Sequence, residues 1–246
     1  MTNTSSIPLG SVTIIGAGRL GRALAAALRG AEINVRGPLR RGEWENRLSA
    51  GEVVLLCVPD GEVARVARAV EADAIVGHCA GALTLEPLSP HRGFSLHPLI
   101  AITGAGTHFD GASAAIAGTS EEMLEIARGL SLRLRMTPIT ISDADRTLYH
   151  AAAVAASNYL VALEETAATI GARVGLERRH LARLAESALS AWVRDGAASL
   201  TGPIVRGDEA VVDRQRKEIA TAFPHLLPFW DALADRTRSI AAGSRS

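Results

Sequence analysis

The sequence predicts an α/β protein in which a doubly wound, mainly parallel Rossmann sheet is followed by an all-α C-terminal domain. A glycine-rich turn comes directly after a buried strand pattern, and short apolar strands then alternate with helices up to residue 141. From residue 142 onward the pattern is helical only. Alternating strands and helices indicate a parallel sheet that is covered on both faces. We therefore expect two domains, residues 1–141 and 142–246.

The first strand and its turn span residues 12–21, Val-Thr-Ile-Ile-Gly-Ala-Gly-Arg-Leu-Gly, and a helix follows over 19–29. In this pattern Gly16 permits a tight turn, Gly18 lets the backbone approach a phosphate, and Gly21 lets the helix pack close to the strand. The unpaired amides at the helix N-terminus face the anion. The pattern predicts a dinucleotide site made by Gly16, Ala17, Gly18, Arg19, Leu20 and Gly21.

The second expected strand, residues 33–36, ends at Arg36, and Arg40 and Arg41 follow closely. In NAD- and FAD-binding proteins an acidic residue at this position holds the ribose 2′-hydroxyl. A carboxylate would repel a 2′-phosphate, whereas an arginine binds it through two charge-assisted hydrogen bonds. We therefore predict NADP rather than NAD or FAD, held by Arg36 and Arg40. The alternative is that these arginines are solvated surface residues.

The rest of the first domain continues the same alternation. Several strands are apolar throughout, as expected where both faces of a sheet are covered. The last strands lie close together in sequence, so an antiparallel edge is plausible. Strands are expected at 53–58, 74–79, 93–97, 114–117 and 134–139, and helices at 61–71 and 120–130.

The carboxyl ends of these strands carry the candidate residues, because ligands of open α/β sheets bind there. Val58, Pro59 and Asp60 are expected beside the nicotinamide ribose, although Asp60 could simply cap the next helix. His78 ends the following strand, where a histidine satisfied by neighbouring backbone is the commoner outcome. His97 ends the third, and a histidine there could polarise a carbonyl or donate a proton.

A polar stripe marks the first helix of the second domain. Tyr149, His150, Ser157 and Asn158 interrupt an alanine-rich run, and positions 150 and 157 share a face of an α-helix. Polar groups on an apolar helix need partners. We expect His150, Ser157 and Asn158 to orient a substrate. The alternative is a hydrogen-bond network between helices or at a subunit interface.

Further helices are expected at 177–195, 208–222 and 225–241, with a loop over 200–208. Thr201 and Arg206 in that loop could bind a substrate carboxylate. Equally, Arg206 and Asp208 could form a structural pair, with Asp208 capping the next helix.

The composition excludes several classes of partner. The net charge is zero, which gives no sign of a nucleic-acid or membrane-surface partner. The longest apolar stretch, within 151–163, is too short and too polar to span a bilayer. Cys57 and Cys79, the two cysteines, are expected to be core residues in a reducing compartment, not a disulfide or a metal site. Residues 1–6 are polar and lack the apolar core of a signal peptide. A cytoplasmic protein without a bound metal is expected.

Together these segments resemble a Rossmann-like family of candidate NADP oxidoreductases whose helical C-terminal domain is known only as a domain of unknown function. That family is similar in architecture to pyrroline-5-carboxylate reductase, prephenate dehydrogenase, ketopantoate reductase and 6-phosphogluconate dehydrogenase. The resemblance implies a homodimer formed through the helical domain, with the active site between domains. The matching stretches are the glycine turn and residues 57–60, 78–81, 96–99, 149–158 and 200–208.

One departure from the relatives is informative. Ketopantoate reductase and the β-hydroxyacid dehydrogenases rely on a lysine in the first helix of the second domain, but the matching helix here has none. The sole lysine, Lys217, lies far downstream in the sequence. The His-Pro turn at His97 is shared in form with prephenate dehydrogenase, which favours histidine chemistry.

The sequence thus predicts an NADP-dependent oxidoreductase that transfers hydride between nicotinamide and a small carbonyl or imine substrate. His97 is the expected proton donor or polarising group. The alternative is a dinucleotide-binding sensor or assembly protein without turnover, in which the candidate residues would not converge.

Overall fold

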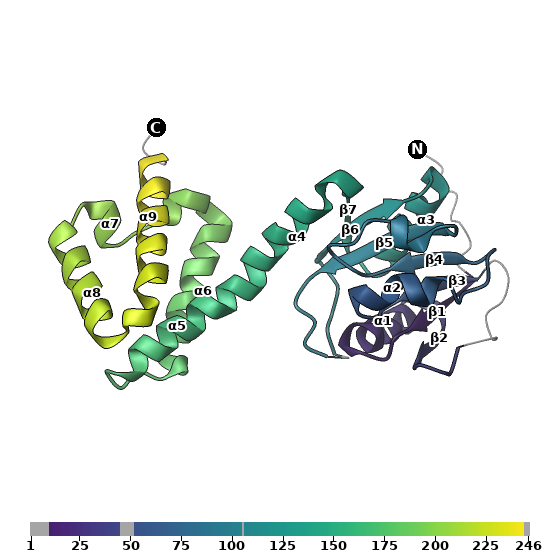
Figure 1. Ribbon diagram of the computed structural model, residues 1–246, viewed down its shortest axis with the longest axis horizontal. Helices are drawn as coiled ribbons and strands as arrows, with labels where there is room; N and C mark the ends of the chain where they lie inside the picture. The colour runs from purple at the N-terminus through teal and green to yellow at the C-terminus, as the bar shows by residue number, and fades with distance from the viewer. Residues whose placement is uncertain (1–9, 45–51, 105, 244–246) are drawn as a thin grey trace. The chain divides into compact units, whose positions relative to one another are not determined.

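The computed structural model describes residues 10–44, 52–104 and 106–243. The chain divides into two compact units, Met1–Leu160 and Val161–Ser246. Figure 1 labels their helices and strands. The polar residues 1–6 lie outside the described residues. Sequence reasoning placed the domain boundary between residues 141 and 142, close to the end of the last strand, whereas the compact units divide after Leu160.

The described part of the first unit contains one seven-stranded sheet in the order β2-β1-β3-β4-β5-β6-β7. Neighbouring strands from β2 through β5 are parallel, β6 runs antiparallel to β5, and β7 is parallel to β6. This confirms the predicted mainly parallel sheet with an antiparallel edge. The strands are β1 (Ser11–Ile15), β2 (Asn34–Leu39), β3 (Val53–Leu56), β4 (Ile75–His78), β5 (Arg92–Leu99), β6 (Ser113–Gly118) and β7 (Thr137–Thr140).

Helices cover both faces of this sheet, as Figure 1 shows. Along β1, Val12 and Ile14 face a core that includes α1 (Arg19–Gly30) and α3 (Glu121–Arg133). Ile15 faces the opposite core, which includes α2 (Asp60–Ala67). Because both faces are buried, the strands need no polar alternation, which explains their continuous apolar runs.

Strand β2 runs further than the sequence predicts. Thr13 pairs with Arg36 and Ile15 with Leu39, so the register shifts between the two pairs. Gly37 has a φ of 95°, which allows the irregular step. The prediction that β2 ends at Arg36 is therefore wrong. Arg36 lies within the strand, and Arg40 is the first residue after it.

A helical stretch without a break begins with α4 (Arg146–Val154), continues through a π-helical turn (Ala155–Tyr159) and enters α5 (Leu160–Ala172). It follows the short η2 (Asp143–Asp145). Side chains of α4 contact β5, as described below, which explains why α4 belongs to the first compact unit.

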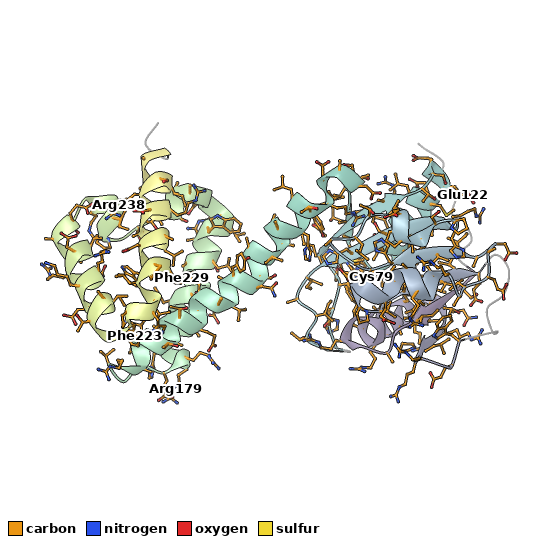
Figure 2. All side chains as sticks on the ribbon, viewed as in Figure 1. Cys79, Glu122, Arg179, Phe223, Phe229 and Arg238 are labelled. Atoms are coloured by element: carbon orange, nitrogen blue, oxygen red, sulfur yellow. The ribbon has the colours of Figure 1, made fainter. Side chains whose placement is uncertain are left out.

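The second unit is helical throughout its described residues, as predicted. Besides α5 it contains α6 (Arg178–Asp195), α7 (Pro203–Arg206), α8 (Glu209–Ala222), α9 (Leu227–Gly243) and the short η4 (Gly196–Ser199) and η5 (Pro224–Leu226). The predicted loop over 200–208 thus contains the short helix α7. Arg216 of α8 donates to both carboxylate oxygens of Asp231 in α9, at 2.8 Å each. Figure 2 labels Phe223, which follows the end of α8, and Phe229, which lies in α9.

Within the described residues, none of the helices combines the length and apolar character that crossing a membrane requires.

Candidate functional site

The glycine turn after β1 is shaped for a phosphate. A Cβ on Gly16 would lie 2.2 Å from the Cys57 carbonyl oxygen, and one on Gly21 would lie 1.8 Å from the Gly16 carbonyl oxygen. The protein itself therefore requires glycine at both positions. A Cβ on Gly18 would meet nothing within 4 Å. Gly18 is the N-cap of α1 and no side chain caps the helix there, so the space over its N-terminus fits an anion.

A cavity of about 300 Å³ extends from this turn toward the end of β2. Its lining includes Ala17, Arg40, Arg41, Pro59 and Arg65, and it leaves out Arg36. The binding of a 2′-phosphate by Arg36 stays a prediction, while Arg40, which was predicted with it, does line the cavity. Because β2 is longer than expected, the chain passes Arg36 before it reaches the cavity.

Three charged side chains in this cavity are already linked. Glu62 accepts from Arg65 Nη2 at 2.5 Å and from Arg41 Nη2 at 3.2 Å. These hydrogen bonds and charges, those of Arg65 first, hold the pKa of Glu62 below its ordinary value. Arg40 donates its backbone N–H to Glu43 at 2.7 Å, while its guanidinium stands outside the Glu62 cluster. The cavity therefore carries an excess of positive charge, which suits a phosphate.

The turn after β3 places Val58 and Pro59 in the cavity lining. Pro59 is the N-cap of α2, and Asp60 is the first helical residue without a side-chain cap bond. The alternative for Asp60, that it caps this helix, is therefore wrong, and its place beside the nicotinamide ribose stays a prediction. Beneath the turn, Cys57 Sγ lies 3.8 Å from the Sγ of Cys79, which is labelled in Figure 2. Both side chains contribute to the core.

A second group of side chains gathers at the carboxyl end of β5. His97 Nδ1 lies 2.6 Å from the hydroxyl of Tyr149, and their rings meet edge to face. The His97 and His150 ring centroids are 6.3 Å apart. A Cβ on Gly81 would lie 2.7 Å from His150 Cδ2 and 3.0 Å from His97 Nε2. The backbone of the turn after β4 thus packs against both rings. We call His97, Tyr149, His150 and Gly81 the His97 cluster.

Burial decides the charge of His97. Loss of solvent, followed by the charges of His150, Arg146 and His78, lowers its pKa to about 4. His97 is therefore a neutral imidazole near pH 7. Such a ring polarises a carbonyl as a hydrogen-bond donor and is a much weaker acid than an imidazolium.

The lowered pKa has a measurable consequence for stability. Because unfolded His97 takes up a proton near its ordinary pKa of 6.5 and the native ring resists it down to about 4, stability should fall as the pH falls between these values. The loss attributable to His97 should reach about 3 kcal/mol at most. We expect His97→Gln to unfold in urea with a smaller change in midpoint between pH 6.5 and 4.5. An equal change in both proteins would contradict the assignment.

His78 has a structural role, as the commoner outcome for such a histidine suggests. Its Nδ1 accepts from the Ala80 N–H at 3.2 Å, and its Nε2 lies 3.0 Å from the Thr84 carbonyl oxygen. Both ring nitrogens are therefore engaged by the chain that follows β4. Burial lowers the pKa of His78, which keeps the ring neutral.

Arg146 at the start of α4 is a component that sequence reasoning missed. Its side chain is only 1% exposed, and its Nη2 donates to Ser95 Oγ in β5. Nε and Nη1 are buried and have no partner among the described residues. The signal that could have found it is helical spacing, since Arg146, Tyr149 and His150 are three and four residues apart and share one face.

The other predicted residues of α4 and its continuation are not brought to His97 by any described contact. Ser157 Oγ donates to the Ala153 carbonyl oxygen at 2.7 Å and lies 3.0 Å from Asn158 Oδ1. Both residues are exposed and sit in the π-helical turn. That turn departs from the 3.6-residue period on which the expectation that positions 150 and 157 share one α-helical face depends, so this expectation stays a prediction.

In the second unit, Arg206 forms the structural pair with Asp208 that was the alternative to a substrate site. Its Nε donates to Asp208 Oδ2 at 2.9 Å. Asp208 therefore makes a structural pair, and its side chain does not cap α8 as predicted. Thr201 lines a separate cavity of about 260 Å³ with Ile204 and Trp230.

The fold and the site can be set beside known proteins. The family described as Domain of unknown function (DUF2520) matches residues 112–237, slightly more than half of the chain. No curated protein matches the sequence.

Solved structures share the fold along almost the whole chain. A candidate NADP oxidoreductase from Bacteroides fragilis is similar with a TM-score of 0.79 and 16% identity, covering 94% of this chain and 99% of its own. A protein from Thermotoga maritima reaches 0.77 and 25% identity, covering 96% and 100%. Pyrroline carboxylate reductase from Plasmodium falciparum, solved with NADP bound, reaches 0.58 and 13%, covering 94% and 98%. The resemblance to Rossmann-like oxidoreductases with a helical C-terminal domain is thereby confirmed.

Proposed function

The chain belongs to the DUF2520 family and has a Rossmann fold, and from this premise we propose that it is an NADP-dependent oxidoreductase acting on a small carbonyl or imine. One observation carries the proposal. The glycine turn and the His97 cluster follow strands β1, β4 and β5, which are parallel, so both lie at the carboxyl edge of one sheet. Dinucleotides and their substrates meet at that edge in open α/β folds.

The residues fit a dinucleotide. Gly16 and Gly21 have no room for a side chain, whereas the space over Gly18 is open. The pyrophosphate would lie over Gly16, Ala17 and Gly18 and the first turn of α1, and Val58 and Pro59 would face the nicotinamide ribose. When bound, the cofactor supplies hydride. The relative from Plasmodium falciparum holds NADP on the same fold.

Preference for NADP over NAD rests on the arginines of the cavity. Arg40 and Arg41 follow the end of β2, where a carboxylate would hold the ribose of NAD. We assign the 2′-phosphate to Arg40, because Arg41 is already bound to Glu62.

This assignment gives a testable preference. We expect Arg40→Gln to weaken NADPH binding about 10–100-fold, since a charge-assisted hydrogen bond contributes roughly 1.5–3 kcal/mol. NADH binding should be unchanged, because NADH lacks the phosphate. Titration by intrinsic fluorescence measures both, with Arg41→Gln as the matched control. Equal losses for the two cofactors would show that Arg40 does not read the phosphate.

The chemistry is assigned to His97, whose neutral ring donates a hydrogen bond to the substrate oxygen or nitrogen. His150 stands beside it and is proposed to orient the substrate. Asn158 and Ser157 are proposed to assist from the π-helical turn. Arg206 would have to leave Asp208 before it could bind a carboxylate, so together with Thr201 it is assigned no step.

The helical unit is proposed to form a homodimer, and the free thiols suit a cytoplasmic setting. Leu184, Trp192 and Val193 on α6 are 68%, 60% and 72% exposed, which is unusual for side chains of this size. Light scattering after gel filtration would test the dimer.

The decisive experiment for the function is a thermal-shift titration with NADPH, NADH and FAD, followed by a panel of carbonyl and imine substrates. Stabilisation by NADPH with turnover supports the enzyme. Stabilisation without turnover on any substrate would favour the alternative, a dinucleotide-binding sensor or assembly protein. No stabilisation by any of the three would refute both.

A further inference from the structure

We infer that Tyr149, His97 and Arg146 form a proton relay, in which Tyr149 supplies the proton that His97 passes to the substrate and Arg146 stabilises the phenolate left behind. The inference rests on the proposed function, because it needs a substrate atom that gains negative charge. It assigns roles to two residues, Tyr149 and Arg146, whose presence the proposed reaction otherwise leaves unexplained.

Tyr149 and His97 are in direct contact. The hydroxyl lies 2.6 Å from Nδ1, a short hydrogen bond between two neutral groups. If the hydroxyl donates to Nδ1, the ring carries its own proton on Nε2. A Cβ on Gly81 would lie 3.0 Å from Nε2 and 2.7 Å from His150 Cδ2, so the Gly81 backbone and the His150 ring both approach this side of the imidazole. We assign to this Nε2 proton the hydrogen bond to the substrate, which is proposed to bind at the carboxyl edge of the sheet.

The groups around His97 include two histidines and an arginine. His150, which is on α4, lies beside His97. His78 lies on β4, and Arg146 reaches β5 from the start of α4. None of the groups that act on the charge of His97 is a carboxylate. When a proton leaves Nε2, none of these groups is a carboxylic acid that could supply another proton to the ring. The hydroxyl of Tyr149 is the donor in contact with the ring.

Arg146 is a buried cation. Arg146 is 1% exposed, and no carboxylate of the described residues lies within ion-pair distance. Asp143 acts on it from further away, and its Oδ2 accepts from the Leu85 N–H at 3.2 Å. Burying a cation without a partner is costly, so a compensating negative charge is expected at some stage of function. A phenolate at Tyr149 provides one.

The placement of the two residues supports this pairing. Arg146 and Tyr149 are three residues apart on α4 and share a face. Burial raises the pKa of Tyr149, while the charge of Arg146 opposes that rise. The resting hydroxyl is therefore neutral and able to donate. Arg146 interacts more strongly with the phenolate than with the hydroxyl, which is the condition for lowering a barrier.

The proton transfer balances within these residues. As the substrate oxygen or nitrogen gains an electron pair, the Nε2–H bond breaks and a proton joins the substrate. The Tyr149 O–H bond breaks in turn, and its proton joins Nδ1, so that the ring stays neutral. The negative charge ends on the Tyr149 oxygen near Arg146. The relay resets when Nδ1 returns its proton to that oxygen and Nε2 takes up a proton from solvent. The hydride comes from the reduced nicotinamide named in the proposed function.

The test begins with the apo protein, so that it does not depend on activity. Long-range ¹H–¹⁵N spectra report which nitrogen of neutral His97 carries the proton. We expect the Nε2–H form in the wild type. We also expect Arg146→Met to raise the pKa of His97 above about 4, because the charge of Arg146 lowers it, and Arg146→Lys to restore the low value. An Nδ1–H ring in the wild type would overturn the relay.

Kinetics test the coupling. With NADPH and a substrate that turns over, Tyr149→Phe should lower kcat about 100-fold with little change in KM. Arg146→Met should lower kcat about tenfold in the wild type and not at all in the Tyr149→Phe background, because no phenolate forms there. Equal losses in both backgrounds would overturn the role of Arg146. Should Arg146→Met not fold, the same comparison is made with Arg146→Gln and with Ser95→Ala, which releases the arginine without removing its charge.

The two levels of the proposal fail differently. If NADPH does not bind, the proposed function fails, while the spectra still decide the tautomer of His97. If NADPH binds and turnover is normal in Tyr149→Phe, the function stands and the relay is refuted.

Discussion

Replacing His97 with alanine should lower kcat for the reduced substrate by about 10²–10⁴-fold, the usual contribution of a positioned proton-transfer group. The ring stands near the carboxyl end of β5 and is hydrogen-bonded to Tyr149, in the position proposed for proton transfer. NADPH binding should be unchanged, since the glycine turn and the cavity at Arg40 do not involve His97. Steady-state kinetics and a parallel cofactor titration separate the two effects.

A matched control is available in another buried histidine. His91 lies in the loop before β5, with its Nε2 2.8 Å from the Ala67 carbonyl oxygen. His91→Asn should lower stability and leave kcat within about twofold of the wild type, because the residue only joins α2 to the strand. Full turnover in His97→Ala, with stability intact, would remove His97 from the reaction.

The second large effect is expected at Gly21. A Cβ there would lie 1.8 Å from the Gly16 carbonyl oxygen, so Gly21→Ala must push α1 away from the turn. Overpacking of this kind costs about 3 kcal/mol or more when backbone must move. We expect a lower midpoint in urea and an NADPH affinity reduced at least tenfold, because the helix N-terminus no longer meets the pyrophosphate.

A substitution at Gly18 separates the effect on stability from the effect on NADPH affinity. A Cβ on Gly18 meets no protein atom within 4 Å, so Gly18→Ala should fold with near-native stability. Its methyl group would occupy the space that the phosphate needs, so NADPH affinity should still fall about tenfold. Native affinity in Gly18→Ala would show that the cofactor does not approach this backbone.

The fold could be predicted because its signals are local. The β-branched strand at 12–15, the glycine turn and the alternation that follows each report on a few consecutive residues, and the sheet order follows from such units. The helical second half was equally clear. The error in β2 arose because the strand passes through Gly37 and Pro38, residues that usually end a strand, by means of an irregular step in register.

The site was predictable only in part. His97 stands out because a histidine followed by proline was predicted to end a strand, although β5 continues through Pro98 to Leu99. Its partners come from distant parts of the chain. Tyr149 contacts it across 52 residues, and Gly81 approaches it from a different turn. The helical spacing of Arg146 from Tyr149 and His150 indicates a shared face but not burial, since an arginine at a helix start is ordinarily exposed. Its burial follows from the docking of α4 on β5, which no local pattern contains.

The π-helical turn at Ala155–Tyr159 has a consequence for how this segment tolerates change. A turn of this kind amounts to one residue added to an α-helix, and the extra residue rotates everything after it relative to everything before. The residues ahead of it, Tyr149 and His150, are fixed against β5. Removing Ala155 or Ala156 from the turn would therefore leave these two in place and swing Ser157 and Asn158 to another side of the helix. Length, as much as residue identity, sets which side chains this segment presents.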